Sequence, residues 1–187
     1  CITKNIIYKG LASHAGGYPE NGINALYAAT CGINAVNAIR ETFVENDKIR
    51  FHPIITNGGS MVNAIPNTVS LESYVRGTSY EAIVKENKKV NRALIGGALS
   101  IGANVEIIDA PGYSPLINDK NMLLLAKDAF NEVLPKKMLE IDENAISAGS
   151  TDMGDLSMIM PVVHPYANGA VGTGHGDNYY IANIDDA

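Results

Sequence analysis

The chain has 187 residues, of which 46% are hydrophobic and 18% are charged, and its formal net charge is −6. This composition is typical of a soluble globular protein with one domain or two small ones. The acidic balance argues against nucleic acid as a partner, because phosphate backbones are bound by clustered Lys and Arg, and no apolar run is long enough to cross a membrane.

The two cysteines, Cys1 and Cys31, do not make a disulfide framework, so the sequence favours a reducing, cytoplasmic location. A leading cysteine also occurs at the mature end of lipoproteins, and that alternative stays open. The missing initial Met more simply indicates a piece of a longer chain.

Two strands and a helix are predicted in the first third of the chain. Residues 3–13 are predicted to form an extended strand that runs into a glycine-containing loop. Residues 21–43 are predicted as a helix with one apolar stripe, made of Ile23, Leu26, Thr30, Ile33, Val36, Ile39 and Phe43. Residues 48–56 alternate as a second strand, in which Pro53 indicates an edge position or a bulge.

A third strand follows the glycine-rich loop that begins at Asn57. Glycines 58 and 59 permit positive φ there. Alternation then places Val69, Leu71, Ser73 and Val75 on the buried face of the strand and Arg76 on its polar face. Residues 79–101 are predicted as a second helix, with Ile83, Val90, Leu94 and Gly97 inward and Glu86 outward, and residues 104–109 as a fourth strand.

The predicted order is therefore βαββαβ over residues 4–112, an α+β, ferredoxin-like arrangement with an antiparallel sheet and two helices on one face. Residues 113–187 differ in character. One helix is predicted to start at Asn118 or Asp119 and to stop at Pro135, and glycine-rich segments follow it. That part offers little apolar surface for a core of its own.

Chemistry-bearing side chains lie mainly in the loops. His14, in a Ser-His-Ala-Gly-Gly turn, is suited to donate to a developing oxyanion, or is a surface histidine. Asn63 and Arg76 are suited to hold a carboxylate, or belong to a hairpin with a solvated arginine. His52 and His164 are interpreted as structural. His175 lies between glycines that would let a metal or substrate approach closely.

No pattern in the sequence completes a metal or nucleophile site. Zinc needs three or four ligands, and neither a His-x-x-x-His nor a Cys-x-x-Cys pattern occurs. Asp152 and Asp155 are a candidate carboxylate pair, although an aspartate there more commonly caps a helix. A serine hydrolase built on Ser150 is disfavoured, because no Gly-x-Ser-x-Gly elbow supports it.

Three motifs, taken together and in order, resemble the aminoacylase/carboxypeptidase-G family of dinuclear-zinc amidohydrolases, in the branch of aminobenzoyl-glutamate hydrolase. Residues 10–19 (GLASHAGGYP) resemble the opening of the family's lid domain. Residues 58–66 (GGSMVNAIP), with Arg76, resemble its central loop and strand. Residues 149–157 (GSTDMGDLS), followed by His175, resemble the closing part of its catalytic domain.

The resemblance implies a role for each matched residue. His14 would reach across a homodimer, formed through the lid, and polarise the scissile carbonyl in the partner's site. Asn63 and Arg76 would hold the carboxylate of a small-molecule amide substrate. The substrate cleft would be lined by Gly149, Ser150 and Thr151. His175 would be a metal ligand, and residues 113–187 would be the C-terminal segment of an α/β zinc-hydrolase catalytic domain.

The family's other metal ligands and its general-base Glu precede the lid and are absent here. The implied function is therefore that of a metal-dependent amidohydrolase with two zinc ions (manganese or cobalt are alternatives), cleaving N-acyl amino acids or aminobenzoyl-glutamate-like amides. The chain as given is expected to be inactive and to bind no zinc, or to bind it weakly. The alternative from another class is a non-catalytic βαββαβ module for dimerisation or small-ligand binding.

Overall fold

The computed structural model describes residues 1–133, 149–166 and 169–182. The chain divides into two compact units. The first comprises Cys1–Ile117 and Asp142–Met160, and the second comprises Asn118–Ile141 and Pro161–Ala187.

The first unit is built on an antiparallel sheet whose central strand is β1 (Ile2–Lys9). On one side β1 pairs with β5 (Asn104–Pro111), and on the other with β4 (Thr68–Arg76). Two short edge strands, β2 (Arg50–Phe51) and β3 (Ile54–Asn57), both pair with β4.

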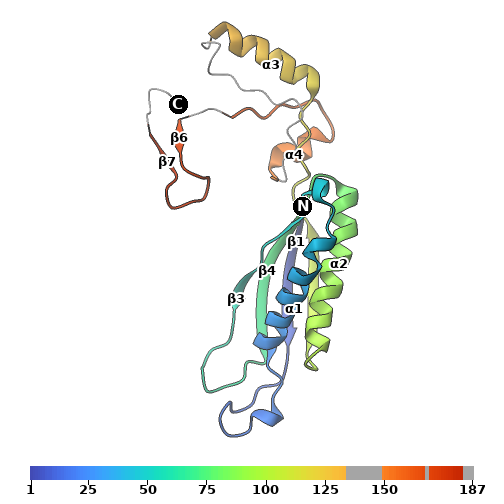
Figure 1. Ribbon diagram of the computed structural model, residues 1–187, viewed down its shortest axis with the longest axis vertical. Helices are drawn as coiled ribbons and strands as arrows, with labels where there is room; N and C mark the ends of the chain where they lie inside the picture. Colours follow the sequence, from blue (N-terminus) through green and yellow to red (C-terminus); the bar gives the residue numbers. More distant parts are fainter. Residues whose placement is uncertain (134–148, 167–168, 183–187) are drawn as a thin grey trace. The chain divides into compact units, whose positions relative to one another are not determined.

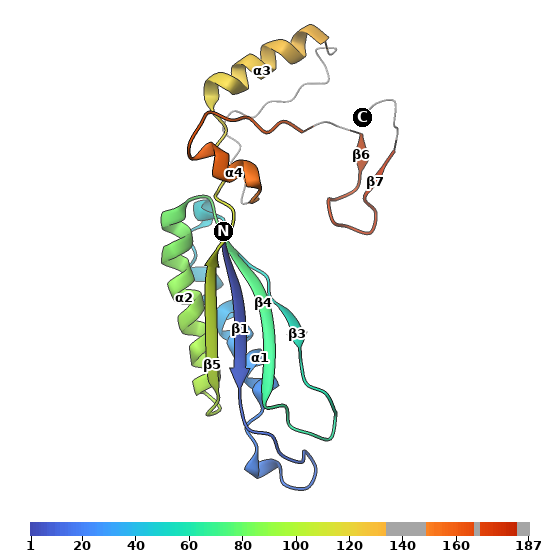
Figure 2. The same ribbon diagram turned by 180° about the vertical axis from the view of Figure 1, so that it is seen from behind.

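Two helices cover one face of this sheet, α1 (Ala25–Ile39) and α2 (Tyr80–Leu99), and no helix among the described residues of the unit covers the other face (Figures 1 and 2). The predicted βαββαβ fold is confirmed. Its second strand is split in two at Pro53, which confirms the predicted edge position, because proline cannot donate to a sheet ladder.

Helix α1 is shorter than predicted, and its most deeply buried residues are not those of the predicted stripe. The Asn24 side chain accepts hydrogen bonds from the amides of Leu26 (2.9 Å) and Tyr27 (3.2 Å) and so sets the start of the helix. Its buried residues are small, namely Ala25, Ala28, Ala29, Gly32 and Val36. Of the predicted apolar stripe, only Val36 is fully buried.

The stripe does face the core, where Ile23, Leu26, Ile33 and Phe43 are partly buried against the core cluster. It is not the most deeply buried part of the helix, because α1 and α2 approach each other too closely for large side chains between them. A Cβ added at Gly97 of α2 would lie 2.2 Å from the amide nitrogen of Gly32. Beneath this contact the hydroxyl of Tyr8 donates to the carbonyl of Leu94 at 3.1 Å, and burial raises the pKa of that phenol well above its ordinary value. Small residues at a helix contact let the backbones meet, and hydrophobic periodicity does not report this.

Helix α2 buries Ile83, Val90, Leu94 and Gly97, as predicted. The outward placement of Glu86 was wrong: its side chain is fully buried, and its Oε2 lies 2.7 Å from Nζ of Lys89. The reason is that a lysine one helical turn away lies close enough to neutralise the carboxylate as it is buried.

A second ion pair, in which only the lysine is buried, joins β1 to β5. Lys4 has a buried side chain and donates to Asp109 Oδ1, while Asn87 (2.7 Å) and Asn91 (3.0 Å) donate to Asp109 Oδ2. Burial raises the pKa of Asp109, but these hydrogen bonds outweigh it and the net pKa is lowered. Burial lowers the pKa of Lys4, and Asp109 opposes that shift. Asp109 is therefore held ionised in the folded chain.

The remaining elements are short. Helix α4 (Asp152–Ser157) belongs to the first unit, and the second holds α3 (Lys120–Val133) and a hairpin of β6 (Ala170–Val171) with β7 (Tyr180–Ile181). Asp119 caps α3 as predicted, by accepting from the amide of Met122 at 2.9 Å. The predicted stop at Pro135 lies outside the described residues. Within the described part, no helix is long and apolar enough to cross a membrane.

Candidate functional site

His14 and Asn63 lie together at one end of the sheet, where two loops are joined by main-chain hydrogen bonds. The loop of residues 10–24 meets the loop of residues 58–67 through Ala15 N to Asn63 O (2.9 Å) and Ile65 N to Ser13 O (2.9 Å), with a bridge between His14 and Ala64. Both candidate side chains are exposed. We call His14 and Asn63 the tip pair.

The turn after His14 determines which ring nitrogen can donate. Its Nδ1 accepts hydrogen bonds from the amides of Gly16 (3.1 Å) and Gly17 (2.8 Å). An accepting Nδ1 places the proton of the neutral ring on Nε2. The loop thus presents an exposed imidazole with Nε2–H as its donor, which is the form that can stabilise a developing oxyanion.

The loop that carries Asn63 contains a glycine with positive φ, as predicted. Gly59 has φ of 120°, a conformation that side chains rarely adopt, and its amide donates to Asn57 Oδ1 at 3.2 Å. Gly58 does not have positive φ. The predicted positive φ is therefore found at Gly59 and not at Gly58.

Arg76 lies at the other end of β4 from Asn63. Thr68 and Arg76 are the two ends of that strand, so they lie about 26 Å apart at the usual rise per residue. Arg76 is half-buried, and its guanidinium lies 4.8 Å from the centre of the Tyr74 ring. Among the described residues it makes no hydrogen bond or ion pair. A single carboxylate cannot reach both Asn63 and Arg76 of one copy.

Ser150 and Thr151 belong to the same unit as Arg76 and lie in the described segment that begins at residue 149. Ser150 forms an antiparallel bridge with Pro115, just beyond β5. Thr151 caps α4, because its Oγ1 accepts from the amide of Met153 at 3.0 Å. Gly149 precedes them and is exposed. We call Arg76, Ser150 and Thr151 the linker-end group.

Asp155 and Ser114, which sequence reasoning did not select as a pair, fasten this segment. Asp155 Oδ1 accepts from both the amide (2.8 Å) and the hydroxyl (2.6 Å) of Ser114, and that hydroxyl also lies 2.5 Å from the hydroxyl of Tyr80. These bonds from Ser114 hold the pKa of Asp155 below its usual range. A Cβ at Gly154 would lie 2.1 Å from the Ser114 carbonyl, so the contact requires glycine.

Arg76 and Asp155 both lie near the same point of the sheet end. The amino group of Cys1 has its pKa lowered by burial first and by Arg76 second, whereas Asp155 acts in the opposite direction. The linker-end group therefore lies in a charged region. Arg76 and Asp155 both act on the amino group of Cys1.

His175 lies in the second unit, in the turn between β6 and β7, with an exposed ring and a φ of 63°. The described residues bring together no group of three His, Cys, Asp or Glu side chains that could hold a metal ion. His164 is half-buried, and its ring packs against Tyr166 at 5.0 Å between centroids. One histidine does not make a dinuclear site, so the described donor set does not fit the implied metal centre by itself.

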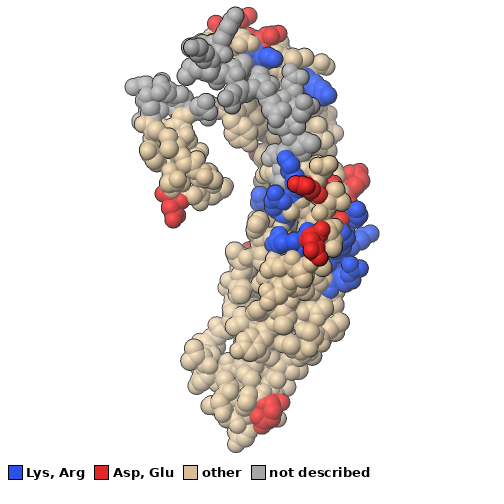
Figure 3. Space-filling model, viewed as in Figure 1, with Lys and Arg blue, Asp and Glu red and all other residues tan. Residues whose placement is uncertain are grey.

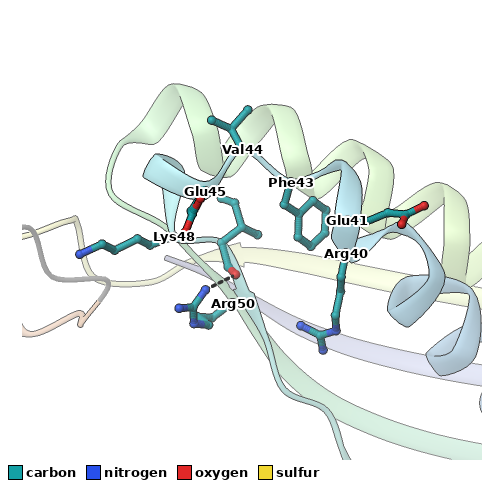
Figure 4. A pocket seen from close by; sticks show the side chains of 8 residues that line it. Arg40, Glu41, Phe43, Val44, Glu45, Lys48 and Arg50 are labelled. Atoms are coloured by element: carbon teal, nitrogen blue, oxygen red, sulfur yellow. Dashed lines mark hydrogen bonds between the residues drawn. The ribbon is translucent and has the colours of Figure 1, made fainter.

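A pocket of about 310 Å³ adjoins the end of the sheet near β2 (Figure 4). Its charged lining residues are Arg40, Glu41, Glu45, Lys48 and Arg50. Sequence reasoning missed this pocket, because it depends on how the turn after α1 folds back beside β2.

The first unit is a βαββαβ domain that carries polar groups at both ends of its sheet, and known proteins share this fold. Residues 2–97 match the peptidase dimerisation domain of the M20 peptidases. Over 164 residues the chain is 35% identical to the Xaa-Arg dipeptidase of Mus musculus, covering 85% of this chain and 37% of the mouse protein.

Solved structures share the fold. A tripeptidase from Staphylococcus aureus has a TM-score of 0.62 at 20% identity, covering 84% of this chain and 40% of that one. The aminobenzoyl-glutamate utilization protein from Klebsiella pneumoniae has a TM-score of 0.55 at 23% identity, covering 68% and 32%.

The chain belongs to the M20 family of peptidases, the family that its three motifs resemble. It spans 37% of the length of the mouse relative that it matches.

Proposed function

We propose that the intact protein is a metal-dependent amidohydrolase that cleaves the amide bond of N-acyl amino acids or aminobenzoyl-glutamate-like substrates, and that it works as a homodimer. Residues 4–112 would be its lid and residues 113–187 part of its catalytic domain. The observation that carries this proposal is the separation of about 26 Å along β4 between the tip pair and Arg76.

That separation supports a site composed from two copies of the chain. Arg76 has the planar donor fork that matches a carboxylate, and no described residue occupies it. His14 offers Nε2–H as a donor for the carbonyl oxygen of the amide. In a two-fold dimer the tip pair of one copy would meet the linker-end group of the other. Asn63 would then contact the substrate from the same side as His14.

The lid has a surface suited to such pairing. The edge strand β3 is exposed at all four of its residues, including two large apolar ones. Ile54 is 62% accessible and Ile55 is 46% accessible. An exposed apolar edge strand is a template for pairing with another strand. Tyr27 of α1 is also exposed. We therefore place the homodimer contact at β3 and α1.

The metal centre is proposed for the intact protein and not for this chain by itself. Zinc, or manganese or cobalt, would supply an activated water and polarise the amide when bound. In this proposal His175 would be one ligand, and the described residues bring together no group of three side chains that could complete the centre. The roles assigned to this chain are therefore carboxylate binding by Arg76, carbonyl binding by His14, and cleft lining by the segment of Ser150 and Thr151.

The test is hydrolysis of a panel of N-acyl amino acids by the intact protein, with and without chelator, and with Arg76→Ala. Loss of a hydrogen-bonded charge partner costs about 3 kcal/mol, so kcat/KM should fall about 100-fold. Amides that lack the carboxylate should be hydrolysed poorly by both proteins. Equal hydrolysis of carboxylate substrates by the variant would remove Arg76 from the site, and no hydrolysis by the wild type with any metal would favour a non-catalytic dimerisation module.

A further inference from the structure

Val62 lies at the apex of a tight turn in the loop that carries Asn63. The amide of Ala64 donates to the carbonyl of Met61 at 3.4 Å, so Val62 and Asn63 are the two central residues of the turn. Such positions are usually taken by Gly, Pro, Asn, Asp or Ser. Val62 is fully exposed, so it buries no apolar surface that would stabilise the fold. Folding therefore does not account for a valine at this position.

The turn is held in a fixed place beside His14. The carbonyl of Asn63 accepts from the amide of Ala15 at 2.9 Å, and His14 forms an antiparallel bridge with Ala64. Val62 therefore lies close along the chain to the residue that is paired with His14. Because the turn is already anchored, its apex side chain can contact a ligand without the cost of ordering a loose loop.

The loops around Val62 are apolar and almost free of charge. Met61 and Tyr18 are also exposed, and the two loops that carry the tip pair contain one charged residue, Glu20, and no Lys or Arg. On the face shown in Figure 3, no Lys or Arg lies at this end of the sheet. A single exposed apolar side chain needs no explanation, but a group of them in the same two loops as an exposed hydrogen-bond donor is typical of a surface that binds an apolar ligand.

We propose that Val62 is a specificity-determining residue that contacts an apolar acyl group of the substrate. This rests on the proposed function, in which His14 of one copy contacts the carbonyl oxygen and Arg76 of the other copy holds the carboxylate. The acyl group is bonded to the carbonyl carbon, so it begins directly beside the oxygen that His14 contacts. The amino-acid half is tethered to Arg76, which leaves the acyl half as the part of the substrate nearest the tip. The favoured substrates carry alkyl or aromatic acyl groups longer than acetyl, because only these extend far enough to be covered by Val62.

The test compares N-hexanoyl with N-acetyl derivatives of one amino acid on the intact protein, because the two substrates differ only in methylene groups. The wild type should prefer the hexanoyl substrate in kcat/KM. Val62→Thr keeps the shape of the side chain but sets a hydroxyl against the alkyl chain, and it should lower that preference about 10-fold. Val62→Ile adds one methylene and should raise the preference about fourfold. Val84→Thr, at an exposed valine of α2, is the matched control and should leave the preference unchanged.

The outcomes separate this role from the proposed function and from a contact between the two copies. If the wild type hydrolyses both substrates equally well, or if neither Val62 variant changes their ratio, Val62 does not select the acyl group and the proposed function stands. If Val62→Thr weakens the dimer in sedimentation and lowers both rates equally, the tip binds the surface of the other copy instead, and the role is refuted. If the wild type hydrolyses neither substrate, the proposed function fails and the role of Val62 fails with it. Because Val62 is exposed and both replacements are also β-branched, the variants should fold.

Discussion

The two ends of the sheet of the dimerisation domain differ in chemistry. The tip loops, residues 10–24 and 58–67, contain one charged residue, Glu20, and expose apolar side chains such as Tyr18 and Met61. Positive and negative side chains gather toward the other end of the helices on the face shown in Figure 3. The tip is joined by main-chain hydrogen bonds, whereas the linker end is fastened by Ser114 and Asp155.

On the proposed function, this difference would let one domain serve a site in two ways. An apolar tip with one defined hydrogen-bond donor is suited to enter a site formed by another copy. A charged linker end is suited to hold an anion close to its own chain. The following predictions test whether the two ends have these separate roles, from the largest expected effect to the smallest.

His14→Ala should cause the largest loss. Removing one donor to a developing oxyanion lowers kcat by about 10²–10³-fold, and because the side chain is exposed the fold should persist. The measurement is steady-state kinetics of the intact protein on an N-acyl amino acid. Glu20→Gln changes the only charge of the tip loops and is the control, with kcat expected to be unchanged. A similar kcat for both variants and the wild type would exclude a catalytic role for the tip.

Asp109→Ala should destabilise the sheet toward the linker end, because it leaves the ammonium of Lys4 buried without its partner. Breaking a buried pair costs about 3–5 kcal/mol, and partial exposure of Asp109 reduces this to about 2 kcal/mol. Denaturant unfolding measures the loss. The control is Glu106→Ala, which removes the exposed pair with Lys9 nearer the tip and should cost less than about 1 kcal/mol.

The same pair predicts the pH dependence of stability. The folded pKa of Asp109 is lowered, so its stabilisation is complete above the unfolded pKa of about 3.9 and is lost as pH falls through the folded pKa. Asp109→Ala should therefore lose less unfolding free energy than the wild type between pH 5 and more acidic conditions, by about the same 2 kcal/mol. Parallel acid profiles for the two proteins would contradict this role for Asp109.

Asp155→Asn should have the smallest effect, on positioning. The asparagine keeps the shape but weakens two hydrogen bonds from Ser114, so kcat/KM should fall about 10-fold through loosening of the segment with Ser150 and Thr151. Because the pKa of Asp155 is lowered, the difference from the wild type should persist as pH falls to about 4 and disappear below the folded pKa. Asp152→Asn is the matched control, and an equal loss in that variant would refute the positioning role.

Periodicity was sufficient for the sheet and the second helix, but not for close packing. The alternation from Val69 to Arg76 correctly assigned both faces of β4, because a half-buried strand must alternate. The most deeply buried residues of α1 were missed because Gly32 and Gly97 meet directly. Glu86 was misjudged because its partner Lys89 allows burial, and the sequence shows the charges without their burial.

The sequence selected candidate site residues but could not show how they are arranged. His14 and Asn63 are 49 positions apart, and only the pairing of their loops shows that they are neighbours. The pairing of Arg50 with Arg76 could not be found by counting residues back from the turn at 58–67. A register irregularity between Ile55 and Asn57 shifts the pairing with β4 by one residue. Such a shift moves a side chain to the other face of a sheet.

The most direct test of the two-ended account is complementation between His14→Ala and Arg76→Ala in the intact protein. Each variant alone should be nearly inactive. Mixed and re-associated at equal amounts, they should recover about a quarter of wild-type activity, because half of the dimers are mixed and each has one intact composite site. Activity that stays at the level of the single variants, with mixed dimers shown to form, would contradict a site shared between two copies.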